Sequence, residues 1–294
     1  MVGRRSHMDG LLRWETTTIQ GRHAAYGAAG PGPTVVFLHG WAVSNQTYKA
    51  GLKRLVQNGF RVLAPALPGF GGSEPLPDDA EMADYAAWVS DFVGAVSGAV
   101  PVVLIGHSFG GGVAIRTAYD HPDQVRALVL VNSIGGSAWR KHGSVVEALQ
   151  ARPLWDWGLH FPRDVWPVRQ VRRVLPVILG DVFTNAVRNP RAVWHSANVA
   201  RLADLTDELE ALKERRLPVV VVWGDRDGIV TRESIESLVA AVGAPEVVTV
   251  EGNHSWLLAD PDRFGEVITN VLTVIERAAA DATEVDEVAS LRTA

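Results

Sequence analysis

The segment PVVLIGHSFGGGVAIRTAYD, residues 101–120, decides the fold of this chain. It starts with an apolar, β-branched run that predicts a buried strand, and it ends in a Gly- and Ala-rich stretch that predicts a helix. Between the two stands a Gly-x-Ser-x-Gly sequence, residues 106–110. A direct turn from strand to helix strains the central residue, and the flanking glycines allow the two elements to approach. The pattern predicts a sharp elbow that exposes the hydroxyl of Ser108.

Runs of the same apolar character recur on both sides of this segment. Such runs are typical of strands buried on both faces of a parallel sheet, with crossover helices between them. Two less apolar runs before residue 34 predict a hairpin at an antiparallel edge. We therefore expect an α/β fold, with a mostly parallel central sheet of about eight strands flanked by helices. The runs are LLRWETTTI (11–19), GRHAAYGAA (21–29), TVVFLHG (34–40), RVLAPALPG (61–69), PVVLIGHS (101–108), ALVLVNS (127–133), LPVVVVWG (217–224) and EVVTVEG (246–252).

The alternation of strands and helices stops after Ser133, and about 80 residues pass before the next strand run. A single crossover helix needs far fewer residues, and several prolines divide this stretch into short helices. The sequence predicts an α/β core made of residues 9–134 and 206–278, with an inserted helical cap at 135–205. The acidic, Ala-rich end, residues 279–294, predicts a disordered tail.

Composition excludes several classes of function. The chain has 294 residues and a formal net charge of −5, which gives no electrostatic footprint for nucleic acid. It has no cysteine, so disulfides and thiolate chemistry are excluded. No apolar run approaches the roughly 18 residues of a membrane span, and the start of the chain lacks a signal-peptide core. We expect a cytoplasmic protein with a small-molecule substrate, no cofactor and no metal; a homodimer is left open.

The elbow, in its strand–turn–helix setting, resembles the α/β-hydrolase fold family over roughly residues 34–275. Members of that family carry nucleophile, acid and histidine in this chain order. The resemblance implies a serine hydrolase with Ser108 as nucleophile and His254, in EGNHSW, as base. It also implies that Asp227, in the loop GDRD at 224–227, orients the histidine. A neutral imidazole there would take the serine proton and return it to the leaving group.

Two other positions bear on the identity of the acid. Asp225 is the alternative within the same loop, although its simpler role is to cap that loop. In some relatives the acid follows the preceding strand instead, but here that strand ends in Asn132 and Ser133, which supply no carboxylate.

The resemblance also implies an oxyanion hole of backbone N–H groups, because negative charge develops on the substrate oxygen during acyl transfer. The expected donors are Phe109, which follows the nucleophile, and Trp41, which follows His39-Gly40. The residues expected around the substrate pocket are His39, Gly40, His107, Trp155, Trp166 and Trp256.

The expected activity is carboxylesterase-like: cleavage of an ester of a small to medium, largely apolar acid through an acyl-enzyme. The cap sequence between Trp139 and Arg201 carries ten basic and four acidic side chains, a net charge of +6. That charge would suit an acidic substrate, although basic runs are more often solvated. A C–C hydrolase of a meta-cleavage-type diketone acid, with a cap arginine such as Arg163, Arg172 or Arg191 at the site, is the alternative. A ligand-binding receptor and a cofactor-free oxygenase on the same scaffold also stay open.

Overall fold

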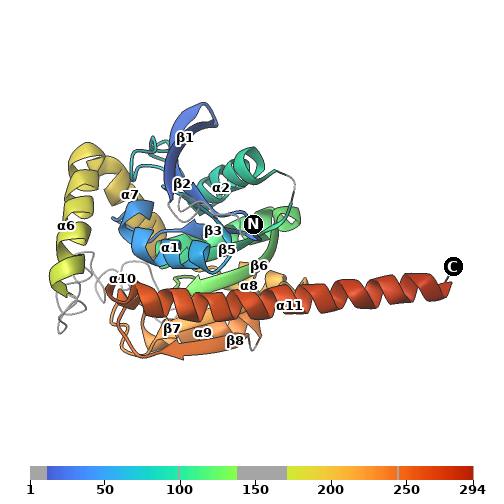
Figure 1. The fold of residues 1–294 in the computed structure, drawn as a ribbon. Coiled ribbons are helices and arrows are strands. Elements are labelled where there is room, and N and C mark those ends of the chain that lie inside the picture. Colours follow the sequence, from blue (N-terminus) through green and yellow to red (C-terminus); the bar gives the residue numbers. More distant parts are fainter. Residues whose placement is uncertain (1–11, 99, 138–170, 244, 294) are drawn as a thin grey trace, which may run out of the picture.

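The computed structural model describes residues 12–98, 100–137, 171–243 and 245–293. Its centre is an eight-stranded sheet in the order β1-β2-β4-β3-β5-β6-β7-β8. Figure 1 shows the strands in the middle of the molecule with helices around them. The strands from β4 to β8 run parallel, whereas β1 and β2 pair antiparallel. The predicted α/β class and mostly parallel sheet are confirmed. The strands are β1 Arg13–Ile19, β2 Arg22–Ala29, β3 Thr34–Leu38, β4 Arg61–Pro65, β5 Val102–His107, β6 Val125–Val131, β7 Val219–Gly224 and β8 Glu246–Val250.

Helices cover both faces of the sheet. One face packs against α2, α3, α8 and α9, and the other packs against α1, α10 and α11. Successive residues of each central strand point to opposite faces of the sheet. In β5, Leu104 packs in the core on the side of α2, α3, α8 and α9, and Ile105 packs in the core on the side of α1, α10 and α11. This two-sided burial explains the continuous apolar runs. The helices are α1 Lys49–Gln57, α2 Met82–Ser97, α3 Phe109–Asp120, α6 Val171–Arg188, α7 Pro190–Leu202, α8 Thr206–Glu214, α9 Arg232–Val242, α10 Trp256–Ala259 and α11 Pro261–Thr293.

The hairpin β1–β2 forms the antiparallel edge that the sequence predicts. Its two-residue turn, Gln20-Gly21, has positive φ at both positions, 52° and 74°. This is the backbone of a turn whose twist matches that of the flanking strands. The edge lies beside β4, far along the sheet from the elbow strand β5.

Helices α6 and α7, yellow in Figure 1, lie to one side of the core and fall within the predicted cap. The chain leaves the core at Gly135 and returns at Asp204, where the two residues form an isolated bridge. The N–H of Leu205 also donates to the carbonyl of Gly135, at 3.1 Å. Residues 138–170 lie outside the described part, so the cap boundaries stay a prediction.

The end of the chain differs from the sequence-based expectation. Helix α11 continues to Thr293, where a disordered tail from residue 279 was expected, and Figure 1 shows it extending past the sheet. Alanine and glutamate have high helix propensity, which outweighs the missing apolar period. Within the described residues, no helix is both long and apolar enough to span a bilayer.

Candidate active site

Ser108 occupies the elbow between β5 and α3. Its backbone has φ 54° and ψ −118°, a region that costs a non-glycine residue about 1–3 kcal/mol. The two motif glycines make this conformation possible by close approach. A Cβ on Gly106 would lie 2.5 Å from the carbonyl oxygen of Gly110, and a Cβ on Gly110 would lie 2.3 Å from that of Leu38. The fold therefore strains Ser108 at the end of a buried strand, where its side chain caps no backbone group.

His254 and Asp227 meet at the same edge of the sheet, in the loops after β8 and β7. Nδ1 of His254 lies 2.8 Å from Oδ2 of Asp227, and both side chains are buried. Since a carboxylate accepts hydrogen bonds, Nδ1 is the donor, and Nε2 is left as the basic nitrogen. The other oxygen, Oδ1, accepts from the N–H groups of Ile229 and Val230 at 2.8 and 2.9 Å.

The pKa of Asp227 is held below its usual value. Burial alone would raise this pKa. Attraction to a protonated His254, and the hydrogen bonds from His254, Asn132 and Val230, lower it by more. The carboxylate therefore stays ionised and can stabilise an imidazolium on His254.

Asn132 is a member of this cluster that sequence reasoning passed over. It follows β6 with φ 45° and is fully buried. Its Nδ2 donates to Oδ2 of Asp227 at 2.5 Å, while its Oδ1 accepts from Nε1 of Trp256 at 2.9 Å. The residue therefore completes the hydrogen bonding of the carboxylate. Its position at the end of the neighbouring strand was the available sequence signal.

A hydrogen-bonded chain connects the loop after β3 with the loop of His254. The N–H of Gly40 donates to the Tyr48 hydroxyl at 3.2 Å, and that hydroxyl lies 2.8 Å from Nδ1 of His107. Nε2 of His107 lies 3.1 Å from the carbonyl oxygen of His254. A carbonyl only accepts, so Nε2 carries the proton and Tyr48 donates to Nδ1. Burial, and the nearby charge of His254, lower the pKa of His107 to about 3, so the ring stays neutral.

His39 has a structural role of the same kind. Its Nδ1 donates to the Gly40 carbonyl at 2.8 Å, and its Nε2 accepts from the N–H of Leu67 at 2.8 Å. Burial lowers its pKa to about 4. Both ring nitrogens are therefore occupied in fixing the turn after β3, although the residue was expected beside the substrate pocket.

The two expected oxyanion donors follow the neighbouring strands β5 and β3. Phe109 begins α3, where the first N–H groups of a helix have no acceptor within the helix. In the described part of the chain, neither this N–H nor that of Trp41 donates to a protein acceptor. The indole of Trp41 donates to the carbonyl of Val193 in α7, at 2.9 Å. The backbone of Trp41 therefore lies directly beneath the predicted cap.

The three other tryptophans assigned to the pocket separate into two groups. Trp256 is buried, packs against Phe264 of α11 and donates to Asn132, so it belongs to the core beneath the His254–Asp227 pair. Trp155 and Trp166 lie outside the described residues. No group of three or more potential metal ligands occurs within the described ranges.

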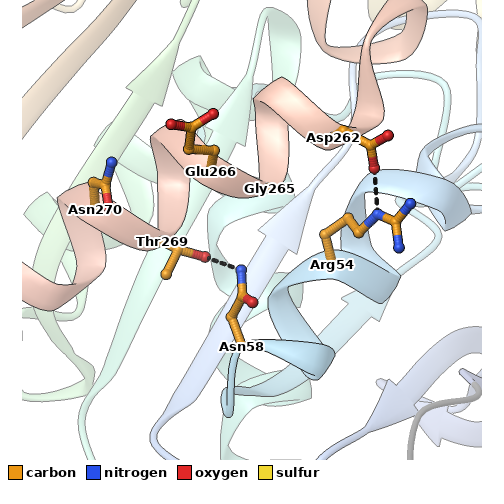
Figure 2. Close-up of a pocket in the computed structure, with 7 residues that line it drawn as sticks. All are labelled: Arg54, Asn58, Asp262, Gly265, Glu266, Thr269 and Asn270. Atoms are coloured by element: carbon orange, nitrogen blue, oxygen red, sulfur yellow. Dashed lines mark hydrogen bonds and ion pairs between the residues drawn. The ribbon is translucent and has the colours of Figure 1, made fainter.

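A pocket of about 420 Å³ lies elsewhere, between α1 and α11 (Figure 2). An Arg54–Asp262 ion pair and an Asn58–Thr269 hydrogen bond cross it. Its lining contains no serine, no histidine and no member of the cluster around Ser108. Its lining residues come from α1, from Asn58 directly after it and from α11, so this pocket is a groove between two packed helices. The exposed ion pair in it contributes little to stability.

Comparisons with known proteins agree with this architecture. The sequence profile of the alpha/beta hydrolase family matches residues 35–267. The sn-1-specific diacylglycerol lipase of Mus musculus is 28% identical over 261 residues, covering 82% of this chain and 81% of the lipase. A putative non-heme haloperoxidase of Mycobacterium phage D29 is 28% identical over 269 residues, covering 89% of this chain and 95% of the relative. The enol-lactonase from Burkholderia xenovorans LB400 shares the fold, with TM-score 0.70 and 20% identity over 88% of this chain and 100% of the lactonase.

Proposed function

The chain belongs to the alpha/beta hydrolase family, and from this premise we propose that it is a serine hydrolase acting on carboxylic esters. Its substrate would be an ester of a small to medium, largely apolar acid. The observation that carries the proposal is the buried His254–Asp227 pair at the same sheet edge as the strained Ser108. A neutral imidazole whose other nitrogen is held by an ionised carboxylate is the base that a serine nucleophile requires.

The reaction proceeds in two halves on these residues. Nε2 of His254 takes the proton of the Ser108 hydroxyl as Oγ attacks the ester carbonyl, and the imidazolium is stabilised by Asp227. The N–H groups of Trp41 and Phe109 donate to the oxygen that becomes negative. His254 then protonates the departing alcohol, which leaves an acyl-Ser108 ester. A water molecule, deprotonated by His254, attacks this ester and releases the acid.

The named relatives support ester cleavage without fixing the substrate. One is called a diacylglycerol lipase, a name that denotes hydrolysis of a carboxylic ester. Another is called a putative haloperoxidase, a name that denotes an oxidation rather than a hydrolysis. A non-hydrolytic activity is therefore the alternative to test. Release of acid from an ester without added peroxide or halide separates the two.

A cap arginine at the site would favour the alternative of a C–C hydrolase. Of the three arginines considered for it, Arg191 is exposed on α7, which does not favour such a role. Arg163 and the side chain of Arg172 lie outside the described part. Arg191 is therefore the weakest of the three candidates for that role.

The test is hydrolysis of p-nitrophenyl esters with acyl chains of two to twelve carbons, followed from the first turnover. We expect a burst of one p-nitrophenol per protein, because p-nitrophenolate is a good leaving group and acylation is then faster than deacylation, so the acyl-enzyme accumulates. Ser108→Ala should abolish both burst and turnover. Ser133→Ala, at the end of the next strand, removes a buried hydroxyl that bonds the Ile134 carbonyl, and it serves as the matched control. Turnover that survives in Ser108→Ala would refute the proposal.

A further inference from the structure

Polar side chains spaced four residues apart bind the core from helix α6 and from the residue that follows its end. Asp181, Asn185 and Asn189 therefore lie along one face, extending just past the helix end. Each binds a loop of the core. Asp181 and Asn185 bind the turn that follows Trp41, and Asn189 donates to the carbonyl of Gly69 at 3.0 Å.

The Asp181 carboxylate collects three hydrogen bonds on one oxygen. Its Oδ2 accepts from the N–H and the hydroxyl of Ser44, both at 2.7 Å, and from the hydroxyl of Thr47 at 2.5 Å. Ser44 is buried and caps the short 3-10 helix Asn45–Tyr48. Hydrogen bonds to an ionised acceptor are roughly twice as strong as neutral ones, so this contact fixes the turn firmly.

The amide of Asn185 holds the preceding part of the same turn. Its Nδ2 donates to the carbonyl of Ala42 at 3.0 Å, and its Oδ1 accepts from the N–H of Gly71 at 3.2 Å. Asn185 is 4% exposed, so its hydrogen bonds are not shared with water. Ala42 has φ 65°, a left-handed conformation that a residue with a Cβ adopts only when its surroundings impose it. The bond to Asn185 is one such constraint.

The backbone on both sides of Trp41 is therefore held by hydrogen bonds. On the core side, the N–H of Gly40 is held by the Tyr48 hydroxyl. On the cap side, Asn185 holds the carbonyl of Ala42, and Val193 of α7 accepts from the Trp41 indole. The Trp41 N–H shares a peptide plane with the Gly40 carbonyl, which accepts from Nδ1 of His39 at 2.8 Å. The cap-side contacts hold the side chain of Trp41 and the carbonyl of Ala42, so they restrain the residue that follows this plane.

We infer that Asp181 and Asn185 are positioning residues, which aim the Trp41 N–H at the oxyanion through the turn 42–47. This inference rests on the proposed function, in which that N–H stabilises the tetrahedral intermediate. Loss of one oxyanion donor lowers turnover by about 10²–10³-fold, and a displacement of about 1 Å can cost 10²-fold. Loosening the turn should therefore reduce kcat by up to about 100-fold.

The experiment compares Asn185→Ala and Asp181→Asn with Asn189→Ala. The last is the matched control, because it also removes a contact of the same helix face to a core loop but leaves the Trp41 turn untouched. We measure kcat and KM on the preferred p-nitrophenyl ester, the Tm, and the inhibition constant of an aryl trifluoromethyl ketone. That ketone forms a tetrahedral adduct with a serine nucleophile and carries the oxyanion.

We expect kcat to fall about 10- to 100-fold in Asn185→Ala and about tenfold in Asp181→Asn, with KM within about threefold. Ketone affinity should weaken in proportion to kcat/KM. The kcat of Asn189→Ala should stay within about threefold of the wild-type value, even if its Tm falls as much as that of Asn185→Ala. Asp181→Asn keeps the side-chain shape and supplies the readout if Asn185→Ala does not fold.

Two results overturn the inference, and they are distinguishable. If wild type is active and kcat falls equally in Asn185→Ala and Asn189→Ala, the polar side chains only attach the cap to the core. The same conclusion follows if the variants change KM alone. Wild type that neither hydrolyses the ester nor binds the ketone would overturn the proposed function, and the inference with it.

Discussion

Replacing Asn132 by alanine tests how the Asp227 carboxylate is held. The substitution removes the 2.5 Å hydrogen bond to Oδ2 of Asp227 and leaves the buried indole N–H of Trp256 without its acceptor. A hydrogen bond to a charged group contributes about 1.5–3 kcal/mol, and an orphaned buried donor costs about 1–3 kcal/mol. The left-handed φ of 45° also favours asparagine over alanine. The free energy of unfolding should therefore fall by about 3–5 kcal/mol, read by urea denaturation at neutral pH.

The same change should lower activity, because Asp227 must stay an anion while His254 is protonated in the transition state. If the whole 1.5–3 kcal/mol appears in the barrier, kcat falls by about 10- to 150-fold, since 1.36 kcal/mol equals a factor of ten. The matched control is Trp256→Phe, which removes the indole N–H but keeps the Asn132–Asp227 bond. It should lose stability, while kcat stays within about threefold. Equal kcat losses in the two variants, or an unchanged kcat in Asn132→Ala, would refute this reasoning.

Three further predictions concern the buried groups around the elbow. Burial lowers the pKa of His39 to about 4, whereas an unfolded histidine has pKa 6.5, so stability is full above pH 6.5 and falls as the unfolded chain takes up protons below it. Between pH 7.5 and pH 5, the free energy of unfolding of His39→Asn, measured by urea denaturation, should therefore fall by about 2 kcal/mol less than that of wild type. An identical pH dependence in the two proteins would contradict this. Tyr48→Phe removes both the acceptor of the Gly40 N–H and the donor to His107. The free energy of unfolding in urea should therefore fall by about 2–3 kcal/mol. A fall of less than about 0.5 kcal/mol would contradict the hydrogen-bonded connection from Gly40 through Tyr48 to His107. Gly110→Ala would place a Cβ 2.3 Å from a backbone oxygen of β3, so soluble folded protein by circular dichroism should be lost, and a folded, active variant would be inconsistent with the packed elbow.

The fold was predictable from the sequence because strands buried on both faces leave an unbroken apolar signature. β5 and β7 are buried along their whole length, and their sequences show it directly. Ser108 was predictable for a related reason: the elbow needs glycine where strand and helix touch, and this requirement is visible as a motif.

The supporting polar contacts were not predictable in the same way. Asn132 reaches Asp227 across 95 residues, and Asp181 reaches Ser44 across 137. A buried amide or carboxylate leaves no local periodic pattern, and its partner is known only once the sheet order is fixed. The α11 extension shows the converse case, in which local helix propensity continues a helix where the acidic, Ala-rich composition predicted a disordered tail.

The most direct test of the central claim is the intact mass of the protein after reaction with a fluorophosphonate probe. The account predicts one adduct per chain, mapped to Ser108 by peptide sequencing. It also predicts no adduct in Ser108→Ala, a full adduct in Ser133→Ala, and labelling of Asp227→Asn slowed by orders of magnitude. Folded wild-type protein that remains unlabelled, or that is labelled at another serine, would contradict the assignment of Ser108, His254 and Asp227 as a catalytic triad.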